Sequence, residues 1–225
     1  MSHFSALLFD LDGTLIDSAP DICASVNQVL ETMNRSNVSV ATVKELVGFS
    51  APTLVKKVLE LTGPPGSQDE IDFLLSSFLE TYRRHPCDHT VVFPGVHQAL
   101  ELFTQAEIQL AICTNKPEIT CFPVIEALGL QKYFSTIICG DTLEHRKPDP
   151  RHVLHTLDKM GAALEEAAFI GDNEIDVNAA KAAGLPCVCV TYGYCRLPYE
   201  SLGADALIDH FEELDGALGV ISGKQ

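Results

Sequence analysis

The chain has 225 residues, of which 46% are hydrophobic and 20% are charged, and this composition excludes an intrinsically disordered protein. Its 31 acidic residues and 15 lysines and arginines give a formal net charge of −16, which argues against nucleic acid or an anionic membrane surface as a partner. No apolar run approaches the ~20 residues that a membrane-spanning helix requires.

The cysteines indicate a reducing environment. There are eight of them, without a Cys-x-x-Cys pair, and the N-terminal segment lacks the basic region of a secretory signal. Disulfide frameworks belong mainly to small secreted proteins. We therefore expect buried, reduced thiols and a cytoplasmic location.

The first structural signal is a strand followed by a long helical region. Ala6-Leu7-Leu8-Phe9 is a continuous apolar run, typical of a strand buried on both faces of a parallel sheet. From 18 to 88 the apolar residues follow helical spacing instead, with a break at Gly63-Pro64-Pro65-Gly66. We predict an all-helical domain over 18–88, inserted into a core domain formed by 1–17 and 89–225.

After Pro94-Gly95 apolar runs alternate with helical segments. This alternation predicts right-handed crossovers and an α/β fold with a doubly wound, mainly parallel sheet. The predicted strands lie at 110–113, 136–139, 167–170 and 187–190, and the predicted helices at 96–103, 118–128, 150–160 and 174–183.

Polar residues stand at the predicted strand ends, where ligands bind in open α/β sheets. Any one of them alone could be a turn or helix-capping residue. Four groups in order, each beside a strand, are hard to explain as caps. These residues are Asp10, Asp12, Thr114, Asn115, Lys147, Asp172 and Asp176.

The chemistry of this set points to phosphoryl transfer. Clustered carboxylates raise one another's pKa unless a cation lies among them, and Mg²⁺ prefers such oxygen ligands. Mg²⁺ also lets a carboxylate approach a dianionic phosphoryl group. Lys147 adds a positive charge, and Thr114 with the main chain of Asn115 can donate to phosphate oxygens. The pattern predicts transfer through an aspartyl-phosphate.

The same residues carry a family resemblance. Asp10-Leu11-Asp12-Gly13-Thr14-Leu15 resembles the first motif of the haloacid dehalogenase-like (HAD) hydrolases, and Thr114-Asn115 resembles the second. Lys147 resembles the third motif, and Gly171-Asp172 with Asp176 the fourth. The resemblance spans nearly the whole chain and implies a Rossmann-like core with an inserted helical cap of the C1 type.

The resemblance also implies roles for these residues. Asp10 would attack phosphorus, and Asp12 would protonate the leaving oxygen and then activate water. Asp10, Asp172 and the main-chain carbonyl of Asp12 would hold Mg²⁺, with Asp176 and Thr14 supporting the metal ligands. The residues that bind the phosphate would be Thr114, Asn115 and Lys147.

The predicted cap carries the substrate signal. The segment 42–50 is similar to a cap segment of phosphoglycolate phosphatases, which commonly have Arg where Lys44 stands and small residues around Gly48. The carboxylate of phosphoglycolate would suit a cation in the cap, so we expect Lys44, Gly48 and Phe49 to bind substrate. Phe49, in place of a small residue, would narrow the pocket or favour an apolar leaving group. Further candidate cations are Lys56, Arg83 and Arg84.

The same resemblance implies that dehalogenases of this superfamily lack an aspartate at the position of Asp12. Asp12 therefore favours a phosphatase or phosphomutase over a dehalogenase. We expect a phosphatase acting on a small phosphorylated metabolite, with 2-phosphoglycolate as the first candidate. Alternatives are a nucleotide or pyrophosphate hydrolase and a β-phosphoglucomutase-like phosphomutase. A non-catalytic binding or regulatory module is disfavoured because Asp10, Asp12 and Lys147 are all present. The protein is expected to be a monomer or a homodimer.

Overall fold

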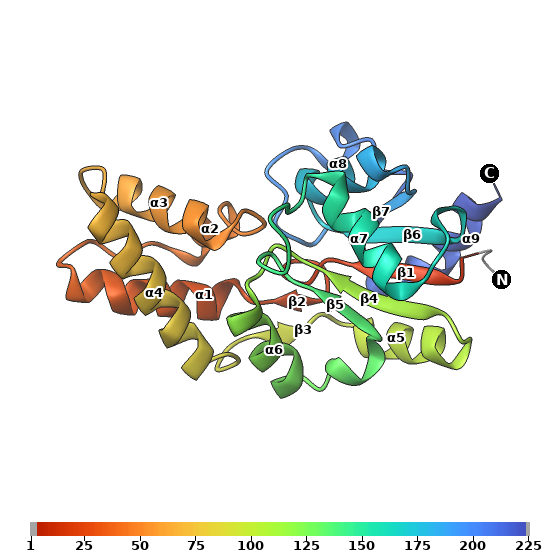
Figure 1. Ribbon diagram of the computed structural model, residues 1–225, viewed down its shortest axis with the longest axis horizontal. Coiled ribbons are helices and arrows are strands. Elements are labelled where there is room, and N and C mark those ends of the chain that lie inside the picture. The colour runs from red at the N-terminus through yellow and green to blue at the C-terminus, as the bar shows by residue number, and fades with distance from the viewer. Residues whose placement is uncertain (1–3, 224–225) are drawn as a thin grey trace.

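The computed structural model describes residues 4–223, and within them one parallel six-stranded sheet has the order β5-β4-β1-β6-β7-β8 (Figure 1). The strand order reverses at β1, which pairs with β4 on one side and with β6 on the other. Ligand sites in such sheets form at the carboxyl end of the strands at this reversal. The strands are β1 (Ala6–Phe9), β4 (Gln109–Cys113), β5 (Thr136–Ile138), β6 (Ala167–Gly171), β7 (Cys187–Val190) and β8 (Ala206–Ile208).

Alternate side chains of β1 pack into two separate apolar cores, one on each face of the sheet. Leu7 and Phe9 face the side covered by α5, α6 and α9, and Leu8 faces the side covered by α7 and α8. This confirms the predicted doubly wound α/β fold. These helices are α5 (Val96–Gln105), α6 (Glu118–Ala127), α7 (Pro150–Met160), α8 (Glu174–Ala183) and α9 (Leu214–Ser222).

Both edge strands of the sheet differ from the prediction. The strand β8 was not predicted, because it has only three residues, lies at the sheet edge and is partly exposed. Strand β5 ends at Ile138, one residue early, because the main-chain N–H of Cys139 donates to the Thr142 hydroxyl. Short 3-10 helices occur at η1 (Gln131–Tyr133), η2 (Leu164–Glu166), η3 (Tyr199–Ser201) and η4 (Phe211–Glu213).

Helices α1–α4 form a separate layer beyond the carboxyl end of the sheet (Figure 1). Serine side chains cap three of them, and Ser67 with Glu70 forms a capping box at the start of α4. That this region is an independent domain over 18–88 remains a prediction. The helices are α1 (Ala19–Thr32), α2 (Val40–Lys44), α3 (Ala51–Thr62) and α4 (Gln68–Arg84).

The two connections between helical region and core run side by side. They pair as the antiparallel strands β2 (Ile16–Asp17) and β3 (Val91–Val92). Near them the Asp21 carboxylate accepts hydrogen bonds from the main-chain N–H groups of His89 and Thr90. These bonds fix where the helical region joins the core. Across residues 4–223, no helix is both long and apolar enough to cross a membrane.

Candidate active site

The predicted polar residues meet at the reversal point of the sheet. Asp10 directly follows β1, Thr114 follows β4, and Asp172 follows β6. Asp176 lies in the first turn of α8, and Lys147 lies in the loop before α7. Side chains from four separate chain segments thus lie at one edge of the sheet.

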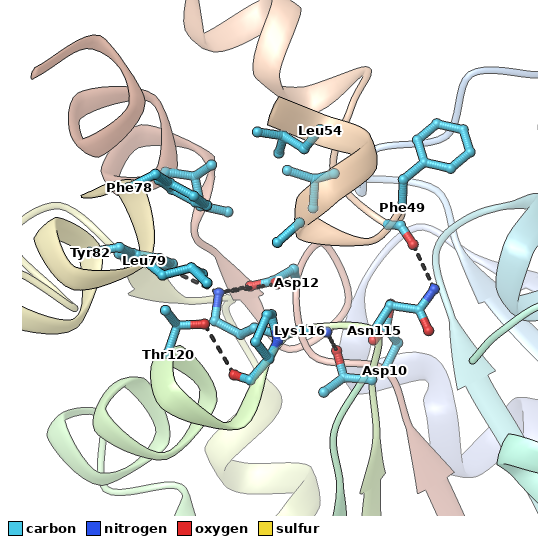
Figure 2. Close-up of a pocket in the computed structure, with 16 residues that line it drawn as sticks. Asp10, Asp12, Phe49, Leu54, Phe78, Leu79, Tyr82, Asn115, Lys116 and Thr120 are labelled. Carbon is cyan, nitrogen blue, oxygen red and sulfur yellow. Dashed lines mark hydrogen bonds and ion pairs between the residues drawn. The ribbon is translucent and has the colours of Figure 1, made fainter. Parts of the chain in front are cut away.

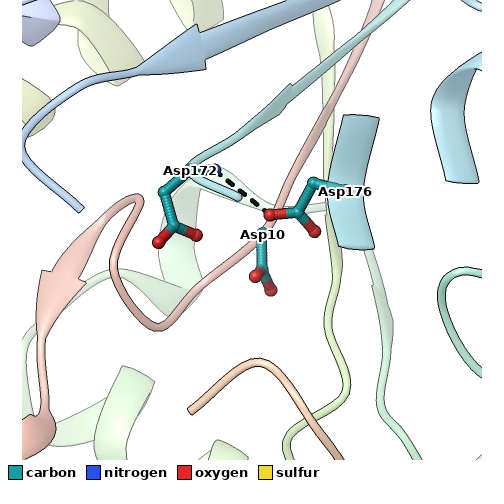
Figure 3. Close-up of side chains that lie close together, drawn as sticks. All are labelled: Asp10, Asp172 and Asp176. Carbon is teal, nitrogen blue, oxygen red and sulfur yellow. Dashed lines mark hydrogen bonds between the residues drawn. The ribbon is translucent and has the colours of Figure 1, made fainter. Parts of the chain in front are cut away.

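The carboxylates of Asp10, Asp172 and Asp176 form a buried cluster, in which the potential ligand oxygens all lie within 4.8 Å of one another (Figure 3). Lys147 Nζ lies 3.0 Å from Asp10 Oδ1 and 2.6 Å from Asp176 Oδ1. One ammonium beside three carboxylates leaves two negative charges when all are ionised. A divalent cation matches this excess.

The burial of this cluster changes its protonation. Burial, reinforced by the Asp176 charge and opposed by Lys147, raises the pKa of Asp10 to about 7. Burial and the charges of Asp176 and Asp10 raise the pKa of Asp172 well above its ordinary value. Burial disfavours the ammonium of Lys147, yet Asp10 and Asp176 bring its pKa above the ordinary value. The cluster therefore holds protons near neutral pH that a bound cation would displace.

The surroundings of Asp172 fit a metal ligand. Its Oδ2 accepts the main-chain N–H of Tyr194 at 2.6 Å, and its Oδ1 accepts bonds from Thr14 Oγ1 and Asn173 Nδ2 at 3.3 and 3.0 Å. A Cβ on Gly13, where φ is +88°, would lie 2.4 Å from Asp172 Oδ2. Only glycine allows the main chain so close to this carboxylate. Two oriented, buried carboxylates, Asp10 and Asp172, fit a hard cation such as Mg²⁺.

Removing divalent cations should make the Asp10 contribution to stability depend on pH. The pKa of Asp10 rises from an ordinary value of 3.8 to about 7 in the folded protein. Between these pH values Asp10 is protonated in the folded state and ionised in the unfolded state. Its contribution to the free energy of unfolding therefore falls as the pH rises to about 7. We expect this contribution to fall by a few kcal/mol, as measured by chemical denaturation in the presence of a chelator.

His152 is the opposing group in this window. Burial lowers its pKa from 6.5 to about 4, so its contribution to stability rises with pH over that interval. The Asp10 effect is therefore the difference between wild type and Asp10→Asn at each pH. Added Mg²⁺ should raise the melting temperature more at pH 8 than at pH 5. An equal effect of Mg²⁺ at both pH values would contradict a cation site on these carboxylates.

Asp12 turns away from the cluster. Its carboxylate lies 3.0 and 3.2 Å from Lys116 Nζ (Figure 2). The same carboxylate accepts a hydrogen bond from Ser18 Oγ at 2.6 Å. Lys116 Nζ also donates to the Tyr82 hydroxyl at 2.9 Å. Lys116 was missed as a site residue. Its only signal in the sequence is its position next to Thr114-Asn115.

Asn115 joins the core to the helical region. Its Nδ2 donates to the main-chain oxygens of Gly48 and Lys147, both at 2.9 Å, and its Oδ1 is buried without a hydrogen-bond partner among residues 4–223. Beside it, the Thr114 hydroxyl accepts the main-chain N–H of Lys116 at 3.2 Å. Thr114 and Asn115 both line the pocket above Asp10.

Two of the predicted substrate-binding residues of the cap, Gly48 and Phe49, lie at the pocket. The Phe49 ring, however, points away from Asp10 and Asp12 in Figure 2. The centre of the ring lies 4.5 Å from Lys57 Nζ and 4.3 Å from Arg196 Cζ.

The predicted cap cations do not line this pocket. Lys44 Nζ binds Asp17 at 3.1 Å and lies over the Tyr194 ring, so the structure does not bring it to the carboxylates. Arg83 and Arg84 pair with Glu80 on the exposed side of α4. Lys56 borders a separate surface hollow between α3 and α4.

The pocket itself lies between the core and α1–α4. Its walls are polar on the core side and apolar where Ile22, Leu54, Phe78 and Leu79 contribute. The pocket volume is about 40 Å³, room for a few water molecules.

Comparison with known proteins places this site in a family. The model of haloacid dehalogenase-like hydrolases matches residues 7–190. Phosphoglycolate phosphatases of Agrobacterium fabrum and Rhodospirillum rubrum are each 38% identical to the chain, over 94% and 95% of it and 91% and 90% of their own lengths. The crystal structure of a predicted phosphoglycolate phosphatase from Haemophilus somnus is similar with a TM-score of 0.92 at 29% identity, covering 96% of this chain and 98% of that one. Since the family match includes every strand end that carries a site residue, the chain belongs to the haloacid dehalogenase-like hydrolases.

Proposed function

We propose that this phosphatase hydrolyses 2-phosphoglycolate in a Mg²⁺-dependent reaction through an aspartyl-phosphate on Asp10. The observation that carries the proposal is the buried Asp10 carboxylate, with Lys147 Nζ at 3.0 Å and Asp172 in the same cluster. The relatives named phosphoglycolate phosphatase support the choice of substrate. The small volume of the pocket, about 40 Å³, supports a small ester over a nucleotide.

In the first half of the reaction an Asp10 oxygen attacks phosphorus while the bond from phosphorus to the glycolate oxygen breaks. Asp12 gives a proton to that leaving oxygen. Lys147 offsets the negative charge of Asp10 and of the phosphoryl group. Mg²⁺ held by Asp10, Asp172 and the main-chain carbonyl of Asp12 would neutralise phosphoryl oxygens and lower the repulsion between the two anions.

In the second half, Asp12 takes a proton from water, and the water oxygen attacks phosphorus of the aspartyl-phosphate. The bond between phosphorus and the Asp10 oxygen breaks, which releases phosphate and restores the carboxylate. Thr114 and Asn115 line the pocket where the phosphoryl group would lie. Thr14, Asp176 and Lys147 would keep the acidic side chains oriented.

The helical region, 18–88 in this proposal, acts as a cap that opens for substrate and closes during hydrolysis. The contact of Asn115 with Gly48 supports this role. Arg196 adds to it, because its guanidinium donates to the main-chain oxygens of Glu45 and Val47, both at 3.0 Å, while pairing with Glu174 at 2.7 Å. Both residues hold the loop between α2 and α3 against the core.

Arg196→Ala should loosen this closed state. Loss of the two charge-assisted hydrogen bonds should raise amide hydrogen exchange of residues 45–49 by roughly 10-fold and raise KM by a similar factor. Hydrogen exchange followed by mass spectrometry measures the first effect. Arg151→Ala is the matched control, since Arg151 pairs with Asp149 on the surface. Unchanged exchange at 45–49 would contradict a role of Arg196 in holding this loop against the core.

We also propose a cytoplasmic location. The eight cysteines all lie within the described residues and are free, which suits a reducing compartment. A monomer or homodimer is expected, and sedimentation analysis would distinguish the two.

The experiment for the proposed function is phosphate release from a panel of esters, with and without Mg²⁺. The panel holds 2-phosphoglycolate, sugar phosphates, nucleotides and pyrophosphate. We expect the highest kcat/KM for 2-phosphoglycolate and no release in a chelator. A higher kcat/KM for a nucleotide or for pyrophosphate would contradict 2-phosphoglycolate as the substrate and identify that compound class instead. Phosphoryl transfer to a sugar phosphate without phosphate release would indicate a phosphomutase.

A further inference from the structure

Lys116 lies where the core meets the helical region. Its side chain is only 3% exposed, yet its ammonium contacts groups from both sides of the pocket, the Asp12 carboxylate and the Tyr82 hydroxyl. Its Nζ also lies 4.4 Å from the centre of the Tyr82 ring. A lysine is rarely buried to this degree without a charged or polar partner. Here one partner is Asp12, a residue that the proposed mechanism needs for proton transfer.

The charges around the pocket make Lys116 unusual. Among the described residues that line the pocket, Lys116 is the only lysine or arginine. Lys147 lies beneath, bound to Asp10 and Asp176. The helical region contributes apolar side chains to the same pocket, including Leu54, Phe78 and Leu79. A second anionic group on a bound ester would be buried there, and burial of an unpaired charge is strongly unfavourable.

We propose that Lys116, together with the Tyr82 hydroxyl, binds the carboxylate of the substrate's leaving group. The Tyr82 oxygen accepts the hydrogen bond from Lys116, so its own proton is available for an acceptor in the pocket. The inference rests on the proposed function and assigns the specificity for a carboxylated ester to the core rather than to Lys44. Because Tyr82 belongs to α4, a carboxylate bound here would also join the helical region to the core.

A consequence follows for Asp12. In the structure both Asp12 oxygens lie within 3.2 Å of Lys116 Nζ. An arriving carboxylate competes for the same ammonium, and Asp12 is then free to turn toward the ester oxygen. Binding of the substrate carboxylate to Lys116 would thereby release Asp12, the residue that protonates the leaving oxygen.

The test measures binding without turnover. Two non-hydrolysable phosphonates are compared by calorimetry with Mg²⁺ present: 3-phosphonopropionate, which carries the carboxylate, and 3-hydroxypropylphosphonate, which does not. The variants are Asp12→Asn and Asp12→Asn with Lys116→Gln. The pair of substitutions leaves no buried charge without a partner, which protects folding. Lys159→Gln, an exposed lysine on α7, is the control.

We expect wild type to bind 3-phosphonopropionate more tightly than the hydroxyl analogue, and Asp12→Asn to increase this preference because the competing carboxylate is gone. The double variant should lose the preference, by roughly 100-fold relative to Asp12→Asn. A double variant that keeps the preference would overturn the role of Lys116. Failure of wild type to hydrolyse 2-phosphoglycolate would instead overturn the proposed substrate, and the two results are independent.

Discussion

Asp10→Asn should abolish hydrolysis of every ester, with a fall in kcat of at least ~10⁴-fold. The amide keeps the shape of the carboxylate but cannot form the aspartyl-phosphate. The fold should survive, because the change removes one of three buried carboxylates that repel one another. Phosphate release under saturating Mg²⁺ measures the loss, and thermal unfolding in a chelator at pH 8 should show a higher melting temperature than wild type.

Asp158→Asn is the matched control for this variant. Asp158 is exposed on α7, so the same change in charge and shape should leave activity unchanged. Substantial activity in Asp10→Asn would mean that another group attacks phosphorus.

Asp12→Asn should slow hydrolysis of 2-phosphoglycolate by ~10²–10⁴-fold, the usual contribution of a general acid and base. The effect should depend on the leaving group. With p-nitrophenyl phosphate, whose leaving group needs no proton, the first half of the reaction should stay fast while attack by water is slow. A burst of nitrophenolate equal to the enzyme concentration is therefore expected in stopped flow.

The burst distinguishes this role from a structural one. A variant that merely misplaces Lys116, which Asp12 holds at 3.0 Å, would slow both halves and give no burst. Absence of the burst, with the first turnover of p-nitrophenyl phosphate slowed as much as that of 2-phosphoglycolate, would contradict proton transfer by Asp12.

The positions of Asp10, Thr114, Asp172 and Asp176 could be predicted from the sequence. Each lies within a few residues of a buried apolar strand, and parallel strands bring their carboxyl ends to one edge. Helix α7 was predicted from Pro150 to Met160 because both ends carry local signals, proline at the start and Gly161 after the end. Such features depend on short stretches of chain.

Lys116 could not be predicted in the same way. Its role depends on the packing of α4 against the core. This packing brings the Tyr82 hydroxyl to 2.9 Å from Lys116 Nζ, although the two residues are 34 positions apart in the chain. The orientation of Phe49 likewise depends on contacts with Lys57 and Arg196, which lie in two different segments of the chain. The sequence offered the cap lysine Lys44 as the substrate cation, whereas tertiary packing pairs it with Asp17. Contacts between helical region and core are therefore what the sequence leaves open.

The most direct test of Asp10 as the nucleophile is to quench Asp12→Asn with acid during its burst and locate the phosphoryl group by mass spectrometry. Slow attack by water should leave the aspartyl-phosphate populated, and a peptide containing Asp10 should carry the phosphoryl group in the presence of Mg²⁺. The same peptide from Asp10→Asn should be unmodified. A burst with the phosphoryl group on another residue, or with no phosphorylated peptide, would contradict covalent catalysis by Asp10.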